Sequence, residues 1–164
     1  MKLYLLRHAT ASDVAPSDEE RKLTQEGREE ARVAGAALAK MGVKPSYVLS
    51  SPLVRARQTA EIAARELEFS KEIELVDELK NNVSTAALLK TLKSCTSDSQ
   101  ILLVGHMPSL SEHVAAFIGS ENADGLPLGK GGVAYVELEP LRTGRGQLRW
   151  LLRQKQLRYI SAQG

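Results

Sequence analysis

The chain has 164 residues, 43% hydrophobic and 26% charged, a balance that suits one globular domain, so we expect residues 1–164 to form a single domain. A net charge of +2 and an aromatic content of 4% argue against a nucleic-acid-binding protein, which needs a basic surface and stacking aromatics. No apolar run approaches the length of a membrane span, and the apolar start is too short for a signal peptide, so we expect no membrane contact. The single cysteine, Cys95, cannot form an internal disulfide, so we expect a cytoplasmic protein.

Short apolar runs without polar alternation predict buried strands. In chain order these runs are Leu3–Leu6, Tyr47–Leu49 and Ile101–Val104, and Ile73–Val76 predicts a further short strand between the last two. The alternating segment Val133–Leu138 predicts a fifth strand, and Gln147–Leu152 a sixth.

Capping residues predict helices between these strands. The predicted helix starts are Thr24, Ser51 followed by Pro52, Ser84, and Pro108 or Ser109, where Ser109 and Glu112 have capping-box spacing. The first helix is predicted to end at Gly42 and the second near Leu67. Alternation of strands and helices predicts an α/β fold, a three-layer α/β/α sandwich with a mostly parallel sheet and an antiparallel edge strand.

Two of the predicted strands end in a histidine, Arg7-His8 after the first and Gly105-His106 after the fourth, and the helix opened by Ser51 carries Arg55. Ligands bind at the carboxyl ends of strands in an open α/β sheet. If the strands are adjacent, two imidazoles and two guanidiniums meet beside a helix start, a combination that suits a phosphate group.

An imidazole among guanidiniums has its protonated form disfavoured, so it stays neutral and is able to attack phosphorus. The second imidazole would stabilise charge on the phosphoryl oxygens. No metal-ligand spacing such as His-x-x-x-His occurs, so we expect neither a metal nor a cofactor.

The sequence resembles the histidine phosphatase superfamily, also called phosphoglycerate mutase-like, and in particular its small SixA-type phosphohistidine phosphatase branch. Four stretches carry the resemblance in the family's order: Leu5–Ala9, Arg21–Gly27, Ser50–Ala60 and Val104–Pro108.

The resemblance implies that His8 is the phosphorylated nucleophile and that Arg7, Arg55 and His106 complete the phosphate pocket. It further implies that Arg21 reaches the phosphate and that Glu78 lies where many family members carry the acid for the leaving group. The usual Arg-His-Gly of the family is Arg7-His8-Ala9 here, which requires a backbone without positive φ at Ala9.

The expected function is therefore a metal-independent phosphatase acting through phospho-His8 on phosphohistidine in a protein, for example a histidine phosphotransfer domain. Only Lys80–Gln100 separates the third and fourth strands, enough for one helix, so the family comparison implies an open pocket. Two alternatives stay open: a phosphomonoesterase or mutase for a small metabolite, and a non-catalytic phospho-group-binding module, which the intact set of site residues disfavours.

Other conspicuous residues are interpreted as structural. Ser51 is interpreted as an N-cap, Arg57 and His113 as exposed helix residues, and Cys95 as an inert loop residue. The basic tail is interpreted as a solvated strand face and terminus, with a docking surface for an acidic protein as the alternative; its cations are Arg142, Arg145, Arg149, Arg153, Lys155 and Arg158.

Overall fold

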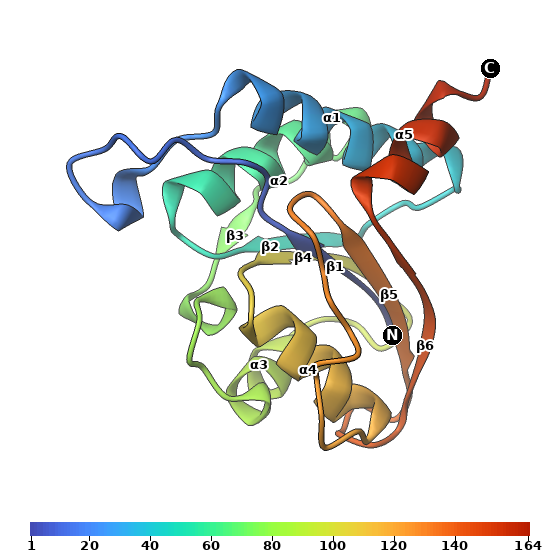
Figure 1. Ribbon diagram of the computed structural model, residues 1–164. Coiled ribbons are helices and arrows are strands. Elements are labelled where there is room, and N and C mark those ends of the chain that lie inside the picture. Colours follow the sequence, from blue (N-terminus) through green and yellow to red (C-terminus); the bar gives the residue numbers. More distant parts are fainter.

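The computed structural model describes residues 1–164 and contains one six-stranded sheet (Figure 1). In chain order its strands are β1 (Lys2–Arg7), β2 (Tyr47–Ser50), β3 (Glu74–Leu75), β4 (Gln100–Gly105), β5 (Val133–Leu138) and β6 (Gly146–Leu152). Across the sheet they are ordered β3-β2-β4-β1-β5-β6. The pairings from β3 to β1 are parallel, and β5 pairs antiparallel with both β1 and β6. The predicted α/β class, with a mostly parallel sheet and an antiparallel edge, is confirmed.

Helices cover both faces of the sheet, which gives the predicted three layers (Figure 1). One face carries α1 (Gln25–Lys40), α2 (Val54–Glu66) and α5 (Gln154–Ala162), and the other carries α3 (Thr85–Leu92) and α4 (Ser109–Ile118). Two single 3₁₀ turns, η1 (Asp18–Glu20) and η2 (Asp77–Leu79), lie in connecting loops.

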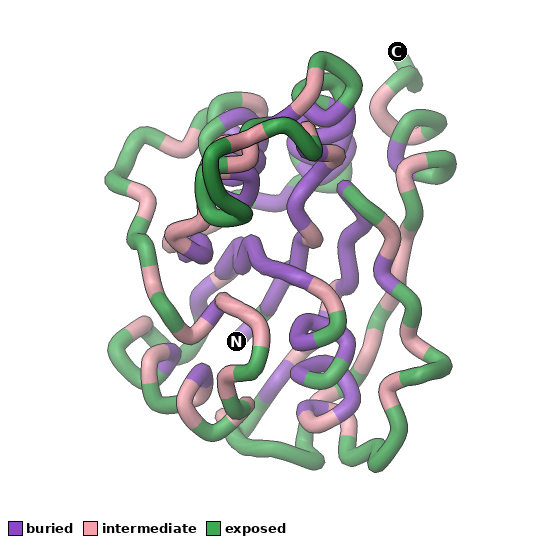
Figure 2. The backbone as a smooth tube through the Cα atoms, turned by 60° about the vertical axis from the view of Figure 1, so that its left-hand side comes forward, coloured by how far each residue is buried: buried purple, intermediate pink, exposed green.

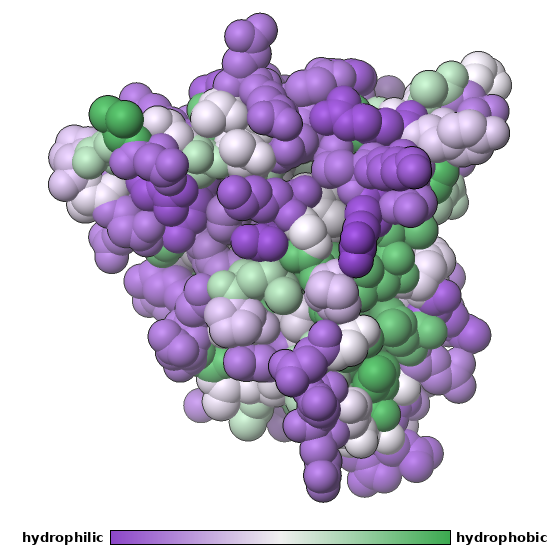
Figure 3. Space-filling view, in the orientation of Figure 1, coloured by the Kyte–Doolittle hydropathy of each residue, from purple (hydrophilic) through white to green (hydrophobic).

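The two faces of β1 and β4 contribute to two separate apolar cores. Tyr4 and Leu6 pack with α1 and α2, whereas Leu3 and Leu5 pack with the α3–α4 side, and all four are at most 5% exposed. Strands buried on both faces have continuous apolar sequences, which is why these runs do not alternate. Figure 2 shows the buried central strands, and Figure 3 shows mostly hydrophilic side chains on the outer face, with apolar atoms gathered over β5 and β6.

Two of the four predicted helix caps are confirmed. The hydroxyl of Thr24 accepts a hydrogen bond from the Gly27 amide at 3.0 Å, and that of Ser84 accepts one from the Ala87 amide at 3.2 Å. These bonds satisfy amide groups that have no partner inside the helix.

The other two predicted caps are wrong. Helix α2 begins at Val54 after Leu53, so neither Ser51 nor Pro52 belongs to it, and the Ser51 side chain instead contacts His106. Helix α4 has no side-chain cap, because the Ser109 hydroxyl accepts a hydrogen bond from the Asn82 amide instead. In both cases a contact distant in sequence takes the hydroxyl that local spacing assigns to a cap.

The basic tail is not a single strand face. It divides between the β5–β6 turn, β6 and the helix α5, which the sequence analysis does not predict. The helix is anchored by Leu157, which is fully buried, and by the partly buried Ile160 three residues on. A stripe of only two apolar residues is a weak periodic signal for a helix.

The interpretation of His113 as an exposed residue is wrong. Its ring is 1% exposed, stacks on Phe117, and has Nδ1 2.8 Å from the Thr85 hydroxyl, so it joins α4 to α3. Cys95 is partly buried against the core on this side. None of the helices has both the length and the apolar character needed to cross a membrane.

Candidate active site

The carboxyl ends of β2, β4 and β1 meet at one edge of the sheet, since β4 lies between the other two. Arg7 at the end of β1 pairs with Gly105 of β4, so the histidines that follow each residue are neighbours. The rings of His8 and His106 have centroids 5.1 Å apart. In Figure 1 this edge lies to the right of the blue loop that carries η1.

His8 presents one free ring nitrogen. Its Nδ1 lies 2.8 Å from the Ala9 carbonyl oxygen. Because a carbonyl only accepts, Nδ1 carries the proton and donates, which leaves the lone pair on Nε2. Nε2 has no hydrogen-bond partner in the protein and is not fully enclosed.

The His8 ring is neutral at physiological pH. Its pKa is lowered to about 3, first by burial and then by the nearby His106, Arg55 and Arg7. The predicted effect of the guanidiniums is present, but burial is the larger cause. The ring is 8% exposed, so its charged form loses most of its hydration.

The loop after His8 is fixed by α1 and α2. The Ala9 amide donates to the Thr59 hydroxyl of α2 at 3.1 Å, and Ala9 has no positive φ, so alanine fits this position. The buried carboxylate of Glu30 accepts from both the amide and the hydroxyl of Thr10. Gly27 packs so closely on Thr10 that a Cβ there would lie 2.0 Å from the Thr10 carbonyl oxygen. These contacts hold the loop after His8, and with it the His8 ring, in place.

Arg7 has donors that the protein leaves unused. Its Nη1 donates to the Leu128 carbonyl oxygen at 3.0 Å, whereas Nε is buried without a partner. The backbone of Arg7 is held by the connector before β5: its amide donates to Gly132, and its carbonyl accepts from Gly131. Burial lowers the pKa of the guanidinium, yet a group with so high an ordinary value stays charged.

Arg55 is 7% exposed on the first turn of α2 and contacts η1. Its Nη1 donates to the Asp18 carbonyl oxygen at 2.8 Å and its Nη2 to the Asp18 carboxylate at 3.1 Å, while Nε is buried without a partner. The hydrogen bond from Arg21, and then Arg55, lower the pKa of Asp18, so this carboxyl is ionised.

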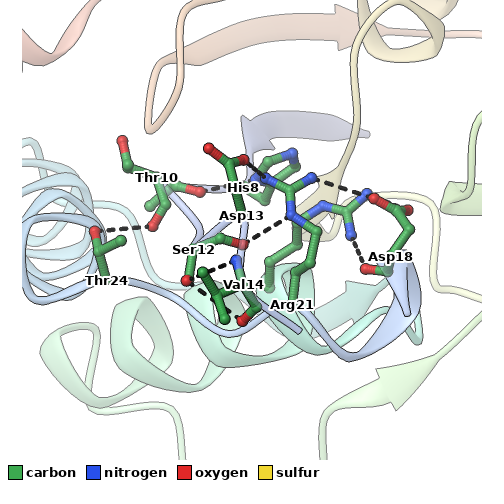
Figure 4. Close-up of polar contacts among 10 residues, drawn as sticks. His8, Thr10, Ser12, Asp13, Val14, Asp18, Arg21 and Thr24 are labelled. Carbon is green, nitrogen blue, oxygen red and sulfur yellow. Dashed lines mark hydrogen bonds and ion pairs between the residues drawn. The ribbon is translucent and has the colours of Figure 1, made fainter. Parts of the chain in front are cut away.

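Arg21 lies beside the site in the loop shown in Figure 4, and each of its nitrogens already has a partner. Nε donates to the Ser12 carbonyl oxygen at 2.9 Å, Nη1 to Asp18 at 3.2 Å and Nη2 to Asp13 at 3.2 Å. Its link to Arg55 therefore runs through the Asp18 carboxylate. Contact with phosphate stays a prediction for this residue.

His106 is 2% exposed and hydrogen-bonded on one side only. Its Nε2 lies 2.8 Å from the Ser51 hydroxyl, and its Nδ1 is buried without a partner. Burial, and then Arg55, lower its pKa to about 4, so this imidazole is neutral too. Ser51 is the site residue that the sequence analysis misses, although it directly follows β2 just as His8 follows β1.

Glu78 lies on η2, which packs against the end of β4, since Leu79 approaches Gly105. Its side chain is half-buried and makes no hydrogen bond or ion pair. The loop that follows is tied to the turn after His106, because the Asn81 amide group donates to the Met107 carbonyl oxygen at 2.8 Å. The role of Glu78 as an acid stays a prediction.

Five cavities of the protein, among them one of about 490 Å³ near Met1 and Glu137 at the opposite end of β1, do not include His8 or His106. No group of three or more histidine, cysteine, aspartate or glutamate side chains is placed to hold a metal ion.

Fold and site together define the class. The family model of the histidine phosphatase superfamily (branch 1) matches residues 3–83. An uncharacterised protein of Picosynechococcus is 34% identical over 137 residues, which cover 81% of this chain and 82% of that protein. The chain belongs to the histidine phosphatase superfamily, and this membership supports its being a phosphatase.

Solved structures place the chain beside the SixA branch. The protein histidine phosphatase SixA, in complex with tungstate, superimposes with a TM-score of 0.86 at 28% identity over 96% of this chain and 99% of that one. A SixA-type protein from Agrobacterium tumefaciens gives a TM-score of 0.75 at 29% identity, covering 93% and 97% of the two chains. The predicted resemblance to SixA is confirmed.

Other matching proteins carry the names of different phosphatases. The alpha-ribazole phosphatase from Shigella flexneri shares the fold at 18% identity, with a TM-score of 0.75 over 94% of this chain and 97% of that one. The serine/threonine-protein phosphatase Pgam5 of Drosophila persimilis is 39% identical over 69 residues, only 24% of its own length and 42% of this chain.

Proposed function

We propose that the chain removes phosphate from phosphohistidine on a protein, through a covalent phosphohistidine at Nε2 of His8. The observation that carries this proposal is a neutral imidazole with a free Nε2 beside buried donors that have no partner. Buried polar groups without partners are rare, and a ligand that accepts hydrogen bonds would satisfy them.

Two displacements at phosphorus complete the reaction. In the first, the lone pair of His8 Nε2 forms a bond to phosphorus while the bond to the leaving nitrogen breaks, and the electron pair departs with that nitrogen. In the second, a water oxygen attacks phosphorus and loses its proton to solvent. The bond to Nε2 then breaks, its electron pair returns to His8, and inorganic phosphate is released.

The surrounding residues supply charge where it develops. Arg7 and Arg55 carry fixed positive charges next to the His8 ring, and His106 offers a ring nitrogen without a partner. Preorganised donors of this kind stabilise the phosphoryl oxygens in the transition state, where little covalent chemistry is left for the protein. Guanidiniums can supply this charge, so the proposal includes no metal ion.

An open rim favours a protein substrate. Between β3 and β4 the chain forms only η2 and α3, and no helical insertion covers the two histidines. A side chain presented on a protein surface can reach a site that no inserted helix covers. The likeness to SixA over more than nine-tenths of the chain supports the same class, and tungstate resembles phosphate in its tetrahedral shape.

The test uses a phosphohistidine-bearing phosphotransfer domain and follows the loss of its acid-labile phosphate. Wild type should release phosphate, the His8→Ala variant should not, and the Arg57→Ala variant, altered at an exposed residue, should match wild type. Activity should survive a chelator. Normal release by a folded His8→Ala protein would overturn the mechanism.

A panel of sugar phosphates and an aryl phosphate tests the substrate class. We expect kcat/KM for the phosphohistidine protein to exceed that for every small phosphate. Faster turnover of a sugar phosphate would assign the chain to the small-molecule phosphomonoesterases. Tight phosphate binding without turnover of any substrate would indicate a binding module.

A further inference from the structure

The Ser51–His106 contact at the base of the site has no role in the steps above. Ser51 is fully buried, and its hydroxyl lies 2.8 Å from Nε2 of His106. The serine comes from the end of β2 and the histidine from the end of β4, so only the assembled sheet brings them together. A buried side-chain pair of this kind can set which ring nitrogen carries the proton.

The hydrogen-bond partners of the Ser51 hydroxyl determine whether Ser51 or His106 donates in this contact. The Ser51 oxygen already accepts a hydrogen bond from the Leu53 amide at 3.3 Å. Its own proton has one acceptor within reach, Nε2 of His106. If the imidazole donated instead, the serine proton would be buried with no acceptor, which costs about 1–3 kcal/mol.

We propose that Ser51 is a positioning residue that donates to Nε2 of His106 and so holds the ring proton on Nδ1, the atom that donates to the phosphoryl group. The inference rests on the proposed phosphatase function for its last step. In the protein alone Nδ1 is buried and has no acceptor, and a phosphoryl oxygen would supply one.

The neighbouring charges are compatible with this arrangement. Arg55 and Arg7 face the His106 ring as cations, His8 lies beside it as a neutral imidazole, and Asp18 is the nearby anion. Burial keeps the ring uncharged, so it holds one proton and has one donor to place. With Nδ1 protonated, that donor is the nitrogen that the protein leaves unpaired.

The ring centroids of His8 and His106 are 5.1 Å apart, so the His106 ring lies within reach of an oxygen of a phosphoryl group on His8. The absence of charge on this donor also matters for product release. The neutral donor stabilises the phosphoryl oxygens without adding a charge that would hold the phosphate product.

Ser50 provides a matched control. It is also fully buried at the end of β2, but its hydroxyl donates to the Ser51 carbonyl oxygen at 2.9 Å and does not contact His106. Ser50→Ala and Ser51→Ala therefore remove the same atom from adjacent buried positions. Only the second should change the histidine.

The first measurement is the ¹⁵N spectrum of the His106 ring in the protein without substrate. Wild type and Ser50→Ala should show Nδ1 protonated and Nε2 unprotonated, and Ser51→Ala should show protonated Nε2. Wild-type protein with its proton on Nε2, or a Ser51→Ala ring unchanged from wild type, would overturn the proposal. This measurement needs no activity, so its outcome is separate from that of the proposed function.

The second measurement is turnover of a phosphohistidine protein. We expect Ser51→Ala to lower kcat by about tenfold to a hundredfold, somewhat less than the loss of a whole oxyanion donor. Ser51→Thr, which keeps the hydroxyl, should restore much of the rate, and Ser50→Ala should stay within about twofold of wild type. Equal losses in both alanine variants, with matching falls in melting temperature, would mean that Ser51 acts through stability alone.

Discussion

A carboxylate oxygen of Asp18 lies 3.1 Å from Nη2 of Arg55, so an anion of the protein itself already contacts the guanidinium proposed to bind phosphate. The same carboxylate pairs with Arg21 at 3.2 Å. The Asp18–Arg55 ion pair joins η1 to the first turn of α2. The pKa of Asp18 is lowered, so its carboxylate is charged at neutral pH. Phosphate entering the site therefore meets a fixed negative charge.

We predict that Asp18→Asn tightens phosphate or tungstate binding by about threefold to tenfold, because like charges repel over these distances even near the protein surface. Asparagine keeps the shape of the side chain and one acceptor oxygen. The dissociation constant, measured by calorimetry at low salt, tests this. Asp13→Asn is the control, since Asp13 is almost fully exposed and pairs only with Arg21. Weaker binding by Asp18→Asn would show instead that the carboxylate is needed to hold Arg55 in place.

Arg55→Ala should weaken tungstate binding, since a charge-assisted contact contributes about 1.5–3 kcal/mol, or roughly 10- to 150-fold in affinity. Arg57→Ala is the matched control on the same helix, because Arg57 is exposed and its partner is Glu61 at 3.6 Å. The dissociation constant of tungstate is measured for both variants. Equal affinities would place Arg55 outside the phosphate site.

Glu78→Gln should separate substrates by leaving group. An alkoxide needs a proton donor as it departs, whereas imidazole, whose conjugate acid has a pKa of about 6.5, can leave already protonated. We expect kcat/KM to fall by about a hundredfold or more on an alkyl phosphate and by less than about tenfold on a phosphohistidine protein. Asp77→Asn, at the exposed neighbour that pairs with Lys80, is the control. Equal losses on both substrates would mean that Glu78 shapes the site rather than donating a proton.

Acid should destabilise the protein through its buried histidines. Burial lowers the pKa of His113 to about 4, against an ordinary value near 6.5 in the unfolded chain. Between these two values the unfolded chain binds the extra proton, so the free energy of unfolding falls as the pH falls, by roughly 1.4 kcal/mol per pH unit for each such histidine. His8 and His106 act in the same direction.

His113→Gln tests this contribution, because His113 is the one histidine of the three that lies outside the candidate site. Urea unfolding between pH 7.5 and pH 5 should give a shallower dependence on pH for the variant, whatever its stability at pH 7.5. An unchanged slope would mean that His113 takes up its proton in the folded protein.

Local sequence determined the elements that carry the site. Uninterrupted apolar runs predict β1 and β4, because strands covered on both faces need no polar alternation. The histidines directly after them follow from that placement, since the carboxyl ends of parallel strands meet at one edge. The sequence predicts Thr24 and Ser84 as caps because each hydroxyl accepts a hydrogen bond from the amide three residues further along the chain.

Only the tertiary structure decided how the polar side chains are used. Ser51 looks like a helix cap in the sequence, but the sheet brings His106 to its hydroxyl from 55 residues away. His113 looks like an exposed helix residue, but α3 buries it. The contact of Asp18 with Arg55 has no local signature either. Short-range patterns depend on backbone geometry that neighbouring residues share, whereas the partner of a buried hydroxyl, imidazole or carboxylate is set by whichever distant segment packs against it.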